Sequence, residues 1–128
     1  MSTLTSHKDL LVWQKSVALA SKVYNATSEL PDDERYGLTR QIRRSAVSVA
    51  SNIAEGAARG RKAEFIHFLN IARGSLTELE TQVLIAANLN MLNAQLRLED
   101  DIIELGRMLT GLIRRLTEQR TMERIVRA

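Results

Sequence analysis

Apolar residues recur along most of this chain at alternating intervals of three and four positions, the spacing that places side chains on one face of an α-helix. In the first such stretch the positions that fit are Leu10, Trp13, Val17, Ala20 and Tyr24. Three further stretches follow, separated by short segments that contain proline, glycine or asparagine. The pattern predicts helices over approximately residues 9–28, 32–59, 61–90 and 95–119.

The segments between the predicted helices contain residues that end or begin a helix. Leu30 precedes Pro31, and a residue before proline is disfavoured in the α region, so the first helix is expected to end before it. Acidic residues follow Pro31 and favour the start of the second helix at residue 32. Gly60 can adopt the left-handed conformation that closes a helix. A loop before the fourth helix is predicted by Asn88, Asn90 and Asn93.

The second, third and fourth helices each have one apolar face that we expect to enter a common core. In the second helix this face comprises Leu38, Ile42, Ala46, Val49, Ile53 and Ala57. In the third helix it comprises Phe65, Phe68, Leu69, Ala72, Leu76, Leu79, Val83 and Ala86, and in the fourth helix Ile102, Leu105, Leu109, Leu112 and Leu116. Short connections force consecutive helices to run antiparallel. The sequence therefore predicts a single all-α domain, an antiparallel up-down-up-down four-helix bundle, with flexible ends at residues 1–8 and 120–128.

Two helices carry a second apolar or small-residue face opposite the first. It comprises Val47, Ala50 and Ala54 on the second helix, and Ala63, Ile66, Asn70, Gly74, Thr77, Thr81, Leu84 and Ile85 on the third. Gly74 costs a helix interior about 1 kcal/mol relative to alanine, which close approach of another backbone would explain, and Gly56 suits the same role. Scattered small residues on a surface are also ordinary. Because contiguous apolar surfaces usually mark contacts, we expect a homo-oligomer.

Composition and motifs exclude several kinds of site. The 128 residues are 45% hydrophobic, enough for a core, and contain no cysteine or apolar run of membrane-spanning length, so a cytoplasmic protein without a membrane partner is expected. Glu64 and His67 have the spacing of a di-iron motif, but such a site needs a second pair and further glutamates. Gly56 and Gly60 lack the rest of a phosphate-binding loop. We expect no catalytic residue, metal, cofactor or small-molecule substrate.

Positive charge is concentrated in one part of the chain. Residues 35–73 contain eight basic and two acidic residues, whereas residues 74–104 contain one basic and six acidic residues. Such blocks arise when neighbouring helices attract one another, or when a surface binds an anion. The candidate contacts to the phosphates of RNA or DNA are Arg40, Arg43, Arg44, Arg59, Arg61 and Lys62. Of the aromatic residues, only Tyr36 is expected to be free to stack. The alternative is a module that assembles proteins and has no role with nucleic acid.

Several segments resemble those of a known family. They are residues 11–15 (LVWQK), 36–48 (YGLTRQIRRSAVS), 51–56 (SNIAEG), 72–75 (ARGS) and 78–82 (ELETQ). Over about residues 8–118 the chain resembles the 23S rRNA-intervening-sequence family of four-helix bundle proteins. The resemblance implies a homopentameric barrel and kinship with the accessory protein of diversity-generating retroelements, which binds nucleic acid and a reverse transcriptase through a basic surface.

The resemblance also implies roles for individual positions. Asn52 and Glu55 would be buried or interfacial polar residues that fix packing. Arg40, Arg43 and Arg44 would belong to the basic surface. Family members often have proline where this chain has Ala50, so a kink in the second helix is not expected here.

Overall fold

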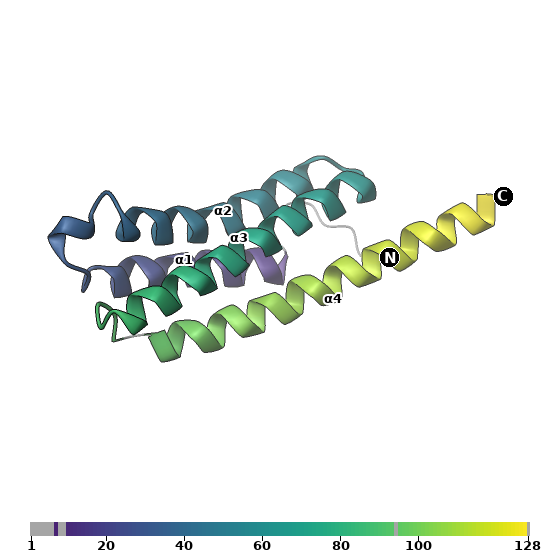
Figure 1. The fold of residues 1–128 in the computed structure, drawn as a ribbon. Coiled ribbons are helices and arrows are strands. Elements are labelled where there is room, and N and C mark those ends of the chain that lie inside the picture. The colour runs from purple at the N-terminus through teal and green to yellow at the C-terminus, as the bar shows by residue number, and fades with distance from the viewer. Residues whose placement is uncertain (1–6, 8–9, 94, 128) are drawn as a thin grey trace.

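The computed structural model describes residue 7 and residues 10–93 and 95–127. Its elements are α1 (Leu11–Thr27), the short 3₁₀ helix η2 (Asp32–Glu34), α2 (Leu38–Ala58), α3 (Lys62–Asn88) and α4 (Gln95–Arg127). The long helices pack as an antiparallel up-down-up-down four-helix bundle, which confirms the predicted all-α class (Figure 1). Each of α1 and α3 contacts both α2 and α4. The expected flexible end at residues 1–8 lies outside the described residues, apart from His7.

The core contains the predicted apolar faces of α2, α3 and α4. Its largest fully buried side chains on these helices include Ile42, Ile53, Leu69, Leu79, Leu98, Leu105 and Leu109. At the ends of the bundle the predicted positions Leu38, Ala57, Phe65 and Leu116 are only partly buried, and pack against this core from its margin. The regular spacing of apolar residues therefore identified the inner faces of three helices.

The predicted inner face of α1 is only partly correct: Leu10 is buried and Trp13 and Ala20 pack partly buried against the core, but the other two positions are not covered. The buried residues of this helix are Val12, Ser16, Leu19, Val23, Ala26 and Thr27, whereas Val17 and Tyr24 are exposed. Both sets have the same three-four spacing, but the buried set contains a serine, and this polar residue interrupts the apolar pattern of the buried face. The hydroxyl of Ser16 donates a hydrogen bond to the Trp13 carbonyl oxygen at 2.7 Å, so this polar group is satisfied inside the core.

The second helix begins later than predicted. Residues 32–34 form η2, and α2 starts only at Leu38. The Glu34 carboxylate accepts a hydrogen bond from the Leu38 backbone N–H at 3.2 Å, which satisfies one of the free donors at the start of α2. The acidic residues after Pro31 thus form a separate turn, and Tyr36 lies between this turn and the start of α2. Gly60, with a φ of 74°, adopts the predicted left-handed conformation.

The fourth helix is longer than predicted. It continues to Arg127, although we expected it to end near residue 119, and its end extends past the other helices (Figure 1). Lys62, at the start of α3, forms an ion pair with Glu123 in this extension. Residues 117–127 contain neither glycine nor proline, so nothing in their sequence interrupts the helix.

Gly56 allows α2 and α3 to approach each other inside one chain. A Cβ atom at this position would lie 2.6 Å from Cβ of Phe68 and 3.1 Å from Cδ1 of Phe65. The suggestion that Gly56 faces another subunit is therefore wrong. Gly74 differs, because a Cβ atom there would meet nothing within 4 Å in the described chain.

These two glycines give opposite predictions for substitution by alanine. Gly56→Ala is expected to lower the free energy of unfolding by about 1–3 kcal/mol, because the new methyl group forces α2 and α3 apart. In the isolated chain, Gly74→Ala is expected to raise it by about 0.5–1 kcal/mol, because alanine is the better helix former and has room there. Urea unfolding followed by circular dichroism measures both. Equal stability of the two variants would contradict the assignment of Gly56 to the contact between α2 and α3.

Candidate nucleic-acid interface

The first group of predicted contacts lies at the start of α2, beside α1 and the turn that precedes α2. Arg40, Arg43 and Arg44 occupy the first two turns of α2. They line an open groove of about 570 Å³, which we call the Tyr36 groove and whose residues are Tyr24, Arg35, Tyr36, Thr39, Arg40, Arg43 and Arg44. The three predicted arginines are therefore brought together, and the fold adds Arg35 to them.

Arg43 is held in place by its neighbours on α1. Its Nε donates a hydrogen bond to Oγ1 of Thr27 at 2.8 Å, and a terminal nitrogen donates to the Tyr24 carbonyl oxygen at 3.3 Å. The guanidinium carbon lies over the Tyr24 ring, 4.6 Å from its centre. This half-buried arginine therefore forms a fixed, positively charged wall of the groove.

Arg40 and Arg44 differ from Arg43 because nothing in the described part of the chain holds their side chains in place. Both side chains are exposed, and neither makes a hydrogen bond or ion pair with another residue in the described part of the chain. Arg35 is also exposed, and its guanidinium carbon lies 5.9 Å from the centre of the Tyr36 ring. The Tyr36 groove consequently has an excess of positive charge that is open to solvent.

The second group of predicted contacts, Arg59, Arg61 and Lys62, lies at the opposite end of α2. Arg59 is separated from Arg44 by 15 positions, about 22 Å along a helix. Each member has a carboxylate partner: Arg59 pairs with Glu55 at 3.3 Å and Glu64 at 3.9 Å, Arg61 pairs with Glu64 at 3.9 Å, and Lys62 pairs with Glu123. The hydrogen bond from Lys62 lowers the pKa of the Glu123 carboxyl. The six predicted contacts therefore form two separate groups, and the second is largely neutralised.

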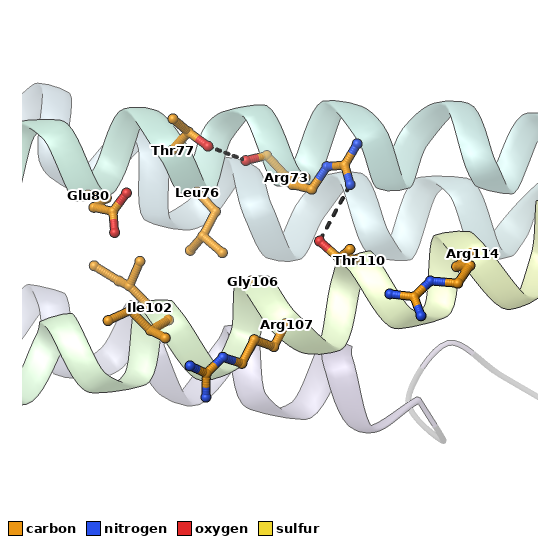
Figure 2. A pocket seen from close by; sticks show the side chains of 10 residues that line it. Arg73, Leu76, Thr77, Glu80, Ile102, Gly106, Arg107, Thr110 and Arg114 are labelled. Carbon is orange, nitrogen blue, oxygen red and sulfur yellow. Dashed lines mark hydrogen bonds between the residues drawn. The ribbon is translucent and has the colours of Figure 1, made fainter.

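A third basic surface lies between α3 and α4 and is not among the predicted contacts. Arg73, Arg107 and Arg114 surround a groove of about 480 Å³ with Leu76 and Ile102 among its apolar lining residues (Figure 2). Arg73 donates hydrogen bonds to Oδ1 of Asn70 at 2.8 Å and Oγ1 of Thr110 at 3.4 Å, so it bridges the two helices. The sequence feature that could have predicted this surface is the seven-residue spacing of Arg107 and Arg114, which places both arginines on one face of α4.

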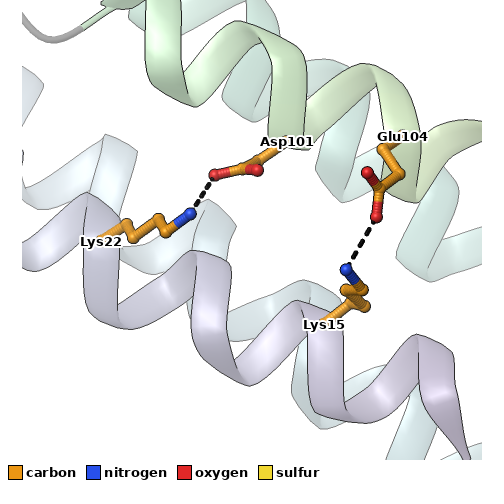
Figure 3. A network of polar contacts seen from close by, with 4 residues as sticks. All are labelled: Lys15, Lys22, Asp101 and Glu104. Carbon is orange, nitrogen blue, oxygen red and sulfur yellow. Dashed lines mark hydrogen bonds and ion pairs between the residues drawn. The ribbon is translucent and has the colours of Figure 1, made fainter.

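The lysines of α1 are neutralised by the acidic block of α4. Lys15 Nζ lies 2.9 Å from Glu104 Oε1, and Lys22 Nζ lies 2.7 Å from Asp101 Oδ2 (Figure 3). Both pairs are exposed. The hydrogen bond with Glu104, together with its charge, raises the pKa of Lys15. Part of the uneven charge distribution therefore reflects attraction between neighbouring helices.

The raised pKa of Lys15 fixes the direction of a pH effect. A raised lysine pKa stabilises the folded state below the ordinary lysine value of about 10.4, and this contribution disappears as the pH rises through the folded-state pKa. The stability difference between the natural chain and Lys15→Gln is therefore expected to be constant between about pH 7 and 9 and to shrink above about pH 10.4. Urea unfolding at several pH values measures it. A difference that grows at alkaline pH would contradict this pairing.

The other polar residues that were singled out make contacts within the chain. Glu64 pairs with the arginines described above, and the exposed His67 packs in a T-shaped arrangement with Phe68, with ring centres 5.3 Å apart. The described residues contain no cluster of three or more histidine, cysteine, aspartate or glutamate side chains that could hold a metal ion. None of the helices in the described ranges is long and apolar enough to cross a membrane.

Asn52 and Glu55 occupy different environments. The half-buried Asn52 donates hydrogen bonds to the carbonyl oxygen and Oγ of Ser48 at 2.8 and 3.0 Å, and Ser48 Oγ lies 2.9 Å from Ser75 Oγ on α3. Glu55 is exposed. Asn52 therefore takes part in a polar contact between helices, whereas Glu55 is not buried within the single chain.

The second face of α3 is exposed, as expected. Leu84 is 54% exposed and Ile85 is 45% exposed, and Gly74 also lies at the surface. Ile66 is an exception, because it is partly buried against the core. The chain therefore leaves apolar side chains of α3 without a partner among the described residues.

Comparison with known proteins places these features in a family context. The family model described as "23S rRNA-intervening sequence protein" matches residues 8–111. The chain is also similar to a crystal structure of a protein of unknown function from the S23 ribosomal protein family of Bacteroides thetaiotaomicron. The two chains are 25% identical and superpose with a TM-score of 0.75, over 80% of this chain and 98% of the other. No curated protein matches the sequence. The family match includes the Tyr36 groove and ends before Arg114.

Proposed function

The chain belongs to the 23S rRNA-intervening sequence protein family, and from this premise we propose that it is a non-catalytic, self-associating bundle that binds nucleic-acid phosphates through a basic surface. The observation that carries the proposal is the exposed, unpaired charge of Arg40 and Arg44 in the Tyr36 groove. Arg43 and Arg35 add positive charge to the same groove.

The geometry of the groove favours a phosphate ligand over a structural role for these arginines. Arg40 and Arg44 are four residues apart on a helix, where like charges destabilise the helix by about 0.2–0.5 kcal/mol. They make no compensating contact with another described residue. A phosphate would neutralise them, and the planar guanidinium group matches its oxygens.

The second group contributes less in this proposal. Each of these side chains has a carboxylate partner: this is true of Arg59, Arg61 and Lys62. A phosphate must displace that carboxylate before it can form an ion pair with the basic side chain. We assign these residues to outer contacts with a long nucleic acid. Arg40, Arg43 and Arg44 form the centre of the interface.

Filter binding across a range of salt concentrations tests the proposal. Because the family description names 23S rRNA, structured RNA is the first ligand to test, with duplex DNA beside it. We expect retention at low salt and a linear fall of log K with log salt concentration, as counterions compete for the phosphates. No retention of either nucleic acid at low salt would contradict the proposal and favour a module that binds only protein.

Self-association is the second part of the proposal. The exposed Leu84 and Ile85 on α3, with Gly74 on the same helix, provide an apolar surface that a second copy can cover. The family resemblance makes a pentamer the expected assembly. Light scattering at micromolar concentration tests this part, and a monodisperse monomer would contradict it.

A further inference from the structure

The Tyr36 groove contains exposed aromatic rings as well as arginines. Tyr36 is 78% exposed and Tyr24 is 45% exposed, and both line the groove. Exposed tyrosines are ordinary when they are scattered singly. Here two of them lie within one groove beside four arginines. This combination provides two kinds of contact, one for phosphate and one for a flat apolar group.

Arg43 makes one of these rings part of a fixed platform. Its hydrogen bonds to Thr27 and to the Tyr24 backbone hold the guanidinium group over the Tyr24 ring. Nucleic-acid bases stack on tyrosine rings and on arginine guanidinium planes. The platform is formed before any ligand arrives, so little conformational entropy is lost on binding.

Stacking of this kind requires a base that is not already stacked in a duplex. In a paired helix both faces of each base are covered, and only the sugar-phosphate backbone and the groove edges are available. An unpaired nucleotide can place its base against Tyr36 or the Arg43 and Tyr24 pair, while its phosphates reach Arg40 and Arg44.

The other basic surfaces lack this combination. No aromatic residue lines the groove between α3 and α4. In the second group, the ring of Phe68 is half-buried and the Arg59 guanidinium carbon lies 5.0 Å from its centre. Within the described ranges, only the Tyr36 groove therefore joins unpaired arginines to exposed tyrosine rings.

We propose that the Tyr36 groove binds unpaired nucleotides, so that this protein prefers single-stranded or looped nucleic acid to a continuous duplex. The inference rests on the proposed function, because it names the class of nucleic acid that the same basic surface takes. Tyr36 and Tyr24 supply the preference for unpaired bases, and Arg40 and Arg44 supply the charge.

Fluorescence anisotropy with labelled oligonucleotides of about 12 nucleotides tests the preference. A single strand is compared with a duplex of the same sequence at one salt concentration. We expect the single strand to bind the natural chain more tightly. Tyr36→Leu is expected to weaken single-strand binding by roughly five- to hundredfold and to leave duplex binding unchanged, because only the stacking contact is lost. Tyr36→Phe keeps the ring and is expected to bind like the natural chain, and circular dichroism checks that both variants are folded.

The outcomes separate this inference from the proposed function. One outcome is that the natural chain binds single strand and duplex equally, and that the double variant Arg40→Gln with Arg44→Gln binds both more weakly. This outcome would overturn the preference for unpaired nucleotides but would still support the proposed binding of phosphates. Binding of neither nucleic acid would overturn both. A polyglutamate peptide of matched charge serves as a competitor. If this peptide displaced the single strand at a concentration equal to that of the strand, the inference would also be overturned, because negative charge alone would then explain binding.

Discussion

Replacement of Arg40 and Arg44 together by glutamine is expected to weaken binding of structured RNA by on the order of ten- to a hundredfold at low salt. The plot of log K against log salt concentration should also become shallower by about two, one for each phosphate contact removed. Both side chains are exposed and unpaired within the described chain, so their replacement should leave the fold intact. Filter binding at several salt concentrations provides the affinities and the slopes.

The matched control for this variant is Arg107→Gln with Arg114→Gln. These arginines are also exposed, and their replacement removes the same net charge from another surface. We expect the control to change the affinity and the slope much less. An equal loss in both double variants would show that the nucleic acid responds to net charge, and it would contradict the assignment of binding to the Tyr36 groove.

Replacement of Leu84 and Ile85 together by glutamate is expected to convert the proposed oligomer to monomers. These neighbouring side chains are 54% and 45% exposed in the single chain, so the substitution costs the isolated bundle little. In an interface the same change would bury two unpaired charges, which is strongly unfavourable. Size-exclusion chromatography with light scattering should then give a mass near the 14.4 kDa of one chain.

The control for the assembly variant lies at the end of α4. Ile125 and Val126 are likewise adjacent and exposed apolar residues, at 62% and 80%. Ile125→Glu with Val126→Glu is expected to keep the assembled mass. Dissociation by this control, with the α3 variant still assembled, would move the interface from α3 to the extension of α4.

The sequence identified the inner faces of α2, α3 and α4 because each has one dominant apolar stripe. In α1 the stripe through Val17 and Tyr24 competes with the stripe through Val12 and Val23 at the same spacing. Only packing against the other helices decides between them, because a helix does not specify which of two equivalent faces is covered. Tyr24 consequently lies in the basic groove, where the sequence pattern had assigned it to the core.

The helix ends were harder to predict for local reasons. Proline and acidic residues do start helices, but here they form η2, and Glu34 caps α2 four residues later. At the other end of the chain, apolar periodicity stops near Leu116 although the sequence still favours a helix. Periodicity reports burial, so it does not detect a helix that extends into solvent.

The six candidate basic residues could be recognised from the clustering of basic residues in the sequence. Their ion-pair partners could be predicted only in part. The pair between Arg59 and Glu55 follows from their spacing of four on one helix. The pair between Lys62 and Glu123 joins residues 61 positions apart, and it requires the three-dimensional fold. The contrast between a neutralised group and an uncompensated group therefore emerged only from the structure.

Protection of arginine side chains from phenylglyoxal tests most directly the proposal that nucleic acid binds in the Tyr36 groove. The protein is modified with and without saturating structured RNA, and mass spectrometry measures the extent of reaction at each arginine. If RNA phosphates occupy the Tyr36 groove, Arg40 and Arg44 lose reactivity when RNA is bound, while Arg107 and Arg114 stay as reactive as before. Unchanged reactivity of Arg40 and Arg44 under saturating RNA would contradict the account.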